Sequence, residues 1–337
     1  MAWPSLENLK VLIEMAPIQK PMRPKITALA LLFFALPVVS HAADPGDWSV
    51  DLVSKRYTGS HTSYEFGNPE PPMQAPLSRL EFPMNAWFGG VAVAGRLDRF
   101  SVSGEVLRNI SSSSTDVFRD SDWTGEKSPP SVKDVYSESS MRIEPSYMAR
   151  LDVDMRVGDL AGLPEWLDVR PVIGVRWQDL NFVTHDGVQS YPASPGSAVD
   201  VLSGDGIRFN QTYWQYFLGA RMAYDVGRHV DLPGLKLSGQ LDWAYVTGEN
   251  RDHHLLRPGR RITYEDTRGS AWHAIVGLAA PLAKDVNLGL SFEYLRIEST
   301  GTHRWTDSLA NGDLSWDNGV KVWSEQKSVN LNLQYVF

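Results

Sequence analysis

The sequence predicts an all-β protein, a ten-stranded antiparallel transmembrane β-barrel. Three observations support this prediction: a secretory signal near the N-terminus, a final segment in which apolar and polar residues alternate, and the same alternation along the rest of the chain. Successive side chains of a β-strand point to opposite faces, so an alternating segment has one apolar and one polar face. A barrel in a lipid bilayer needs this pattern, because its outside contacts lipid and its inside is polar.

The N-terminal segment has the layout of a secretory signal peptide. Basic residues within 22–25 precede the apolar run 26–40, and small residues at Ser40–Ala42 follow as a cleavage site. The apolar run has about 15 residues, whereas a membrane-spanning helix needs about 20. We therefore predict that residues 1–42 are a cleaved signal peptide with an N-terminal extension and that residues 43–337 form the barrel domain.

The final segment, residues 328–337, alternates most strictly. Its two faces consist of Val329, Leu331, Leu333, Tyr335 and Phe337 on one side and Ser328, Asn330, Asn332 and Gln334 on the other. A terminal strand that ends in phenylalanine resembles the insertion signal of bacterial outer-membrane barrels. The alternative is an edge strand of an ordinary sandwich, which the export signal makes the weaker interpretation.

The same alternation predicts ten strands, separated by connections of two lengths. The predicted strands are 47–58, 77–95, 99–111, 139–157, 167–182, 208–225, 234–250, 261–280, 286–299 and 319–337. Every second connection is long: 59–76, 112–138, 183–207, 251–260 and 300–318. Outer-membrane barrels have long extracellular loops and short periplasmic turns, so we expect all five long connections on the extracellular side.

The composition excludes several other classes of protein. The chain of 337 residues has no cysteine, which rules out a disulfide framework, a zinc–thiolate site and a cysteine nucleophile. Its net charge of −8 argues against a nucleic-acid partner. No segment after the signal has 18 consecutive apolar residues, which excludes a bundle of transmembrane helices.

Two of the long connections carry side chains suited to acid–base chemistry. Asp120 and Asp122 lie in the second, within DSDW, and Asp252 and His254 lie in the fourth, within DHHLLRPGRRITY. Inward residues of the preceding strand have even numbers, so Asp252 and His254 share the inner face if that strand continues, about 6.5–7 Å apart. A carboxylate beside an imidazole fixes its tautomer and raises its basicity, which suits a general base.

Each motif taken alone has a simpler explanation. The two aspartates could be a turn pair or weak calcium ligands, and histidines in loops are usually solvated. The nearby cations Arg257, Arg260 and Arg261 could bind anions, but pairing with loop carboxylates is the plainer interpretation. Only the combination of the motifs, in the second and fourth loops of one barrel, favours a catalytic site.

In these two motifs the sequence resembles the omptins, outer-membrane endopeptidases of Gram-negative bacteria. Omptins carry an aspartate pair in the second loop and an Asp-x-His dyad ahead of PGKRITY in the fourth; the matching residues are Asp120, Asp122, Asp252 and His254. The resemblance implies a barrel that extends above the outer membrane, with its active site facing the exterior. It also implies that a water held between the two pairs hydrolyses peptide bonds of extracellular proteins or peptides.

The sequence departs from the omptin pattern at the positions that select the substrate. Omptins cut between basic residues and use two acidic groups in the S1 pocket, where this chain has Asn250 and Ser63. Glu249 and Glu65 are the nearest acids and are therefore the predicted substrate-binding residues. A preference for arginine or lysine does not follow from this arrangement.

The lipid-binding positions differ as well. Two arginines that bind lipopolysaccharide on the omptin barrel wall correspond here to Asp179 and Thr212. We expect no cofactor, a monomer in contact with outer-membrane lipid, and lipopolysaccharide as a candidate requirement for activity. The alternative function is a non-proteolytic barrel acting as an adhesin or a structural protein. A transport pore ranks third, because side chains can fill a barrel of this size.

Overall fold

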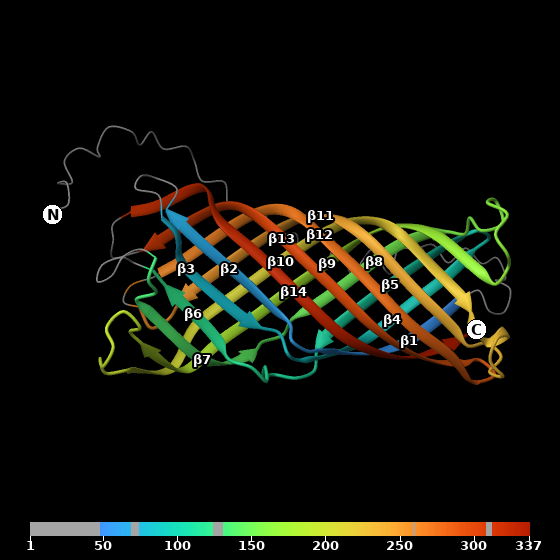
Figure 1. Cartoon of the computed structure of the whole chain (residues 1–337), viewed down its shortest axis with the longest axis horizontal. Helices are drawn as coiled ribbons and strands as arrows, with labels where there is room; N and C mark the ends of the chain where they lie inside the picture. The colour runs from blue at the N-terminus through green and yellow to red at the C-terminus, as the bar shows by residue number, and fades with distance from the viewer. Residues whose placement is uncertain (1–47, 69–73, 124–130, 258, 260, 308–311) are drawn as a thin grey trace. The chain divides into compact units, whose positions relative to one another are not determined.

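The computed structural model describes residues 48–68, 74–123, 131–257, 259, 261–307 and 312–337, and most of them lie in β-strands (Figure 1). The strands are β1 (Trp48–Tyr57), β2 (His61–Asn68), β3 (Gln74–Pro83), β4 (Trp87–Leu97), β5 (Phe100–Asn109), β6 (Phe118–Asp122), β7 (Val135–Ile143), β8 (Tyr147–Met155), β9 (Leu167–Ser190), β10 (Asp200–Asp225), β11 (Lys236–His254), β12 (Arg261–Ala283), β13 (Val286–Asp307) and β14 (Gly312–Val336). Within this part of the chain the helical content is a short 3-10 turn, η2 (Val226–Arg228), and no helix has the length and hydropathy of a membrane span. The predicted signal peptide, residues 1–42, lies outside the described residues.

The fourteen strand segments build a closed ring of ten strands. The order around the ring is β1-β4-β5-β8-β9-β10-β11-β12-β13-β14, and β1 pairs with β14 to close it. Neighbouring strands are antiparallel throughout. Closure gives each described strand of the ring a partner on both sides, as a lipid environment requires. The prediction of a ten-stranded antiparallel barrel is confirmed.

The first four strands of the ring are interrupted and continue as β2, β3, β6 and β7. These segments pair in the order β2-β3-β6-β7 and join β14 to β9, so the barrel is closed above the interruptions too. Figure 1 shows them gathered at one end of the barrel, which we call the upper end. The described parts of the predicted long connections belong to this end.

Strands at the upper end extend further than the sequence predicts. β9 continues to Ser190 and β10 begins at Asp200, well inside the predicted third loop. β6 lies within the predicted loop 112–138, so the expectation that Asp120 and Asp122 are loop residues is wrong. The outer face is less uniformly apolar here than in the lower half, so the alternation that marks a strand in the sequence fades.

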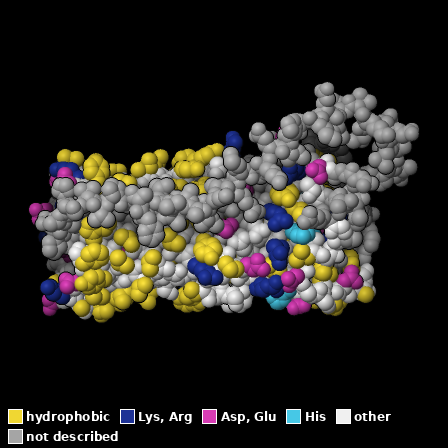
Figure 2. All heavy atoms as spheres, turned by 180° about the vertical axis from the view of Figure 1, so that it is seen from behind, with side chains coloured by type: hydrophobic (Ala, Val, Ile, Leu, Met, Phe, Trp, Pro, Cys, Tyr) yellow, Lys and Arg dark blue, Asp and Glu magenta, His cyan; other side chains and the backbone are white. Residues whose placement is uncertain are grey.

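Exposed apolar side chains gather on the outer surface of the lower half of the barrel (Figure 2). They include Leu52, Val91, Ile173, Leu218, Leu241, Trp243, Leu290 and Leu331. In the same view charged and histidine side chains concentrate at the upper end. A broad apolar band on a closed barrel is typical of a surface that contacts lipid.

The interior of the lower half holds a network of ionic side chains. Lys55 Nζ lies 2.8 Å from Glu293 Oε2, and the His273 ring bridges Glu293 and Asp242 at 3.0 and 2.8 Å. Arg176 Nη2 contacts both carboxylate oxygens of Asp242, at 2.5 and 2.6 Å. These side chains span the barrel from β1 to β9 and occupy its lumen, which weakens the transport-pore alternative.

Above this network a layer of aromatic rings fills the barrel. Phe82 lies 4.1 Å from Phe209 and 4.7 Å from Phe118, measured between ring centroids. Tyr64 also stacks on Phe209, at 5.6 Å, and all four side chains are fully buried. The layer forms a closely packed floor, and the predicted catalytic side chains project from the strands around it.

Candidate active site

The predicted dyad lies at the upper end of β11. The strand runs without a bulge to its last residue, with Asp252 paired to Phe209 of β10 and to Thr263 of β12. Even-numbered residues therefore point inward as far as His254, as the sequence parity predicts. Asp252 is fully buried, His254 is 22% exposed, and His254 Nε2 lies 3.5 Å from Asp252 Oδ2.

Asp252 has a second partner that sequence reasoning missed. The Tyr64 hydroxyl of β2 donates a hydrogen bond to Asp252 Oδ2. The other carboxylate oxygen, Oδ1, is buried without a hydrogen-bond partner among the described residues. No signal in the sequence points to Tyr64, because its proximity to Asp252 depends on how β2 and β11 face each other across the lumen.

The aspartate pair lies on β6, which is hydrogen-bonded between β3 and β7. Asp120 is in register with Leu80 and Ser137, and Asp122 with Ser78 and Val135. Residues two apart on a strand project from the same face, so both carboxyl groups point the same way. The spacing of the two acids, with one residue between them, is therefore the spacing that places two side chains on the same face of a strand.

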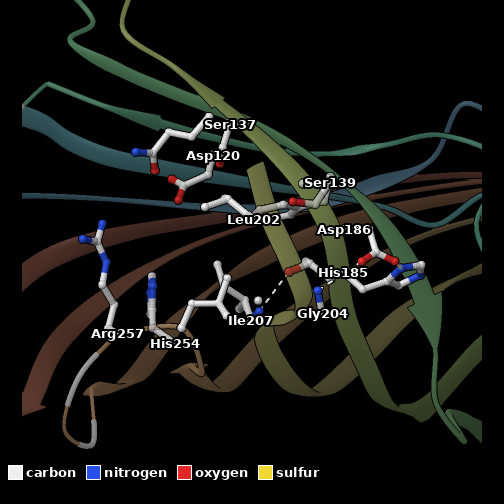
Figure 3. Close-up of a pocket in the computed structure, with 16 residues that line it drawn as sticks. Asp120, Ser137, Ser139, His185, Asp186, Leu202, Gly204, Ile207, His254 and Arg257 are labelled. Carbon is white, nitrogen blue, oxygen red and sulfur yellow. Dashed lines mark hydrogen bonds and ion pairs between the residues drawn. The ribbon is translucent and has the colours of Figure 1, made fainter. Parts of the chain in front are cut away.

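A cavity of about 170 Å³ brings the two segments together (Figure 3). Asp120 and His254 both line it, together with Arg257, and Figure 3 shows the Asp120 carboxyl above and the His254 ring below, on parts of the wall that come from different strands. Ser137, Ile207 and Leu202 form further parts of the wall. Side chains about 130 residues apart in sequence thus share one solvent-accessible space.

The two aspartates do not titrate as ordinary carboxyl groups. Burial, together with the neighbouring Asp122 charge, raises the pKa of Asp120 to about 8, although His254 acts in the opposite direction. Burial also raises the pKa of Asp122, while the Ser78 hydroxyl and His254 oppose this shift. The pair therefore holds a proton at neutral pH, which allows it both to donate and to accept hydrogen bonds.

The surroundings of the His254 imidazole raise its pKa, which is the direction that a general base requires. Burial by itself would lower the pKa of His254, but the Asp252 carboxylate outweighs it and Asp120 adds to the effect, so the pKa is raised. Arg257 acts against this rise. A raised pKa makes neutral His254 a stronger proton acceptor once it is deprotonated.

Both predicted substrate-binding acids lie on the outer face of the barrel. Glu65 contacts Arg79 of the neighbouring strand, with Glu65 Oε2 2.7 Å from Arg79 Nε. Glu249 is exposed on the odd-numbered face of β11, opposite in direction to Asp252. The strand alternation turns both carboxylates away from the cavity, so their proposed contact with substrate gains no support from this geometry.

The two positions that match the omptin S1 acids are neutral and buried. Asn250 points inward and accepts a hydrogen bond from Gln211 Nε2 at 3.1 Å, and Thr62 donates to Gln211 Oε1 at 2.7 Å. Ser63 is buried on the odd-numbered face of β2. The inner wall below the dyad is therefore built here from amide and hydroxyl groups.

Three of the four other residues singled out in the sequence, Asp179, Thr212 and Arg261, lie among the described residues. Thr212 Oγ1 lies 3.4 Å from Asp179 Oδ1, in direct cross-strand register. The Arg261 guanidinium stacks on the Trp305 ring at 4.7 Å. Arg260 lies outside the described residues. Within the described part of the chain, no group of three or more histidine or acidic side chains could hold a metal ion.

Comparison with known proteins supports the fold. The chain matches the outer membrane protease OmpT from Escherichia coli with a TM-score of 0.76 at 14% sequence identity, covering 87% of this chain and 98% of OmpT. The fold is the one seen in OmpT. The chain is less similar to the translocator domain of the autotransporter NalP from Neisseria meningitidis, with a TM-score of 0.35 and 10% identity over 92% of this chain and 95% of that one. Its similarity to the Pseudomonas putida toluene transporter TodX has a TM-score of 0.31 and 9% identity over 87% of this chain and 91% of that one. No protein-family model and no curated protein sequence matches the chain.

Proposed function

We propose that the protein is an outer-membrane endopeptidase of the omptin type. It hydrolyses peptide bonds of extracellular proteins or peptides at the upper mouth of the barrel, facing the exterior of a Gram-negative cell. The observation that carries this proposal is the shared cavity of Asp120 and His254, because two segments distant in sequence supply complementary acid–base groups to one space. The resemblance of the motifs and the OmpT-like fold support the same assignment.

The arrangement supports hydrolysis by an activated water molecule. His254 takes a proton from a water that attacks the peptide carbonyl carbon, and Asp252 orients the imidazole and stabilises its positive charge. The protonated member of the Asp120–Asp122 pair donates a hydrogen bond to the oxyanion. Collapse of the intermediate breaks the C–N bond, and the leaving amine receives the proton from His254.

This mechanism predicts a bell-shaped dependence of kcat/KM on pH. Activity rises as His254 loses its proton, and it falls near pH 8, where Asp120 loses the proton it donates. The variant Asp122→Asn removes a neighbouring negative charge, so the pKa of Asp120 falls and the falling limb moves to lower pH. Rates over a pH series test this; a falling limb that stays at the same pH in Asp122→Asn would contradict the assignment.

The membrane location makes a separate prediction. Leu331 is 48% exposed within the apolar band, and replacing it with arginine places a charge against lipid. We expect Leu331→Arg to lower the free energy of unfolding in lipid vesicles by about 2–4 kcal/mol. Val188, also 48% exposed but at the upper end of β9, provides the matched control, and Val188→Arg should have little effect. Equal effects of the two variants would argue against a lipid-facing band.

A mixed peptide library tests the activity itself. The purified and refolded protein, with and without lipopolysaccharide, should cleave members of the library, and the cut sites define the preferred residues. We propose that the enzyme works as a monomer, without a cofactor, and that lipopolysaccharide is the partner to test first. Absence of cleavage in both states would favour the alternative of a non-proteolytic adhesin or structural barrel.

A further inference from the structure

Tyr64 is held in a fixed place behind the proposed dyad. Its ring is fully buried and lies between Phe209 and Phe66, at centroid distances of 5.6 and 6.4 Å and interplanar angles of 13° and 22°. Three stacked rings leave the side chain little rotational freedom. The direction of the Tyr64 hydroxyl is therefore set by packing, independently of the group that it contacts.

The hydroxyl is aimed at the carboxylate that orients the imidazole. It donates to Asp252 Oδ2, the same oxygen that lies 3.5 Å from His254 Nε2. Asp252 is fully buried, and Oδ1 has no partner among the described residues. Tyr64 is thus the one neutral donor that the described residues offer to this carboxylate, and without it the carboxylate is held by the imidazole alone.

Several other ionisable side chains surround the dyad. The groups that face the dyad are Tyr64 from β2, Asp120 and Asp122 from β6, Glu265 from β12 with its partner His303 from β13, and Arg257 after β11. Glu265 is buried two residues from Thr263, the cross-strand partner of Asp252, and contacts His303 Nδ1 at 2.9 Å. A second buried carboxyl group thus lies near Asp252, and the Tyr64 hydroxyl is the hydrogen-bond donor directed at the Asp252 carboxylate.

We infer that Tyr64 is a positioning residue of the proposed site: its hydroxyl orients the Asp252 carboxylate, which in turn orients the His254 imidazole. This inference rests on the proposed function. Burial, with the charges of Asp252 and Glu265, raises the pKa of Tyr64 well above its ordinary value. The hydroxyl therefore remains a donor throughout the range in which the enzyme works.

The test is the variant Tyr64→Phe, which removes the hydroxyl and keeps the ring stack. We expect kcat to fall about tenfold to a hundredfold, as for loss of one hydrogen bond to a charged group, with KM little changed. The charge of Asp252 then acts more strongly on His254, so the rising limb of the pH profile moves to higher pH. Tyr213→Phe is the matched control, because Tyr213 is equally buried and the described residues show no hydrogen bond from its hydroxyl to Asp252 or His254.

Repeating the Tyr64→Phe substitution in an Asp252→Asn protein distinguishes a positioning role from general destabilisation. If Tyr64 acts through Asp252, then Tyr64→Phe has no further effect on kcat in an Asp252→Asn protein. An unchanged pH profile in Tyr64→Phe, or an equal loss in Tyr213→Phe, would overturn the inference while leaving the proposed function intact. Failure of the wild-type protein to cleave any peptide would instead remove the proposed function on which the inference rests.

Discussion

The variant His254→Ala is expected to lose peptidase activity by about a hundredfold to ten thousandfold in kcat, the usual contribution of a general base. The loss should appear in kcat rather than in KM, because the imidazole accepts its proton only as the water attacks. His254 is 22% exposed beside a fully buried Asp252, so its removal leaves that carboxylate with Tyr64 as its hydrogen-bond partner. Initial rates with a cleaved library peptide measure the effect.

A matched histidine controls for unspecific effects of the substitution. His229 lies in the connection after η2 at the opposite end of the barrel, where its ring contacts the Tyr224 hydroxyl at 2.5 Å. His229→Ala should retain the wild-type rate. If His254→Ala also retains the wild-type rate, the imidazole is not the base and the proposed mechanism fails.

The variant Asp242→Ala is expected to cause the largest loss of stability. Asp242 is fully buried in the lower lumen, where it accepts hydrogen bonds from Arg176 and Gln240 and lies 2.8 Å from His273 Nδ1. Removing one partner of a buried ion pair leaves the other charge uncompensated, which costs about 3–5 kcal/mol. Urea unfolding in lipid vesicles, followed by the shift in electrophoretic mobility of folded barrels, measures this loss.

An exposed ion pair provides the comparison. Asp159 contacts Arg99 at 2.6 Å near a turn of the lower end, where both side chains are exposed. Asp159→Ala should leave the stability almost unchanged, because exposed pairs contribute little. Similar stabilities of Asp242→Ala and the wild-type protein would show that the internal network does not hold the barrel together.

Much of the barrel could be predicted from the sequence, because lipid and lumen impose opposite demands on successive side chains. Segments such as 328–337 therefore show their strand period directly. The strands of the upper end were harder to predict from the sequence. β6 has the pattern of a loop, since serines and charged residues surround it and its outer face lacks the apolar residues that a lipid-facing strand shows.

The inward direction of Asp252 and His254 could be predicted for the same reason as the strands. Parity along β11 is a local property, and it assigns Asp252 and His254 to the inner face without knowledge of any other strand. Tyr64 could not be predicted, because its contact with Asp252 crosses the lumen. Glu65 and Glu249 have the right charge near the right positions, but a shift of one residue along a strand reverses the direction of a side chain.

The joint action of the two segments can be tested most directly by a double-mutant cycle. The rate of peptide hydrolysis is measured for the wild-type protein, Asp120→Asn, His254→Ala and the double variant. If both side chains act on one water molecule, the double variant loses about as much activity as the more damaging single variant. Losses that multiply, or a wild-type protein that cleaves no peptide, would contradict a shared catalytic site at the mouth of the barrel.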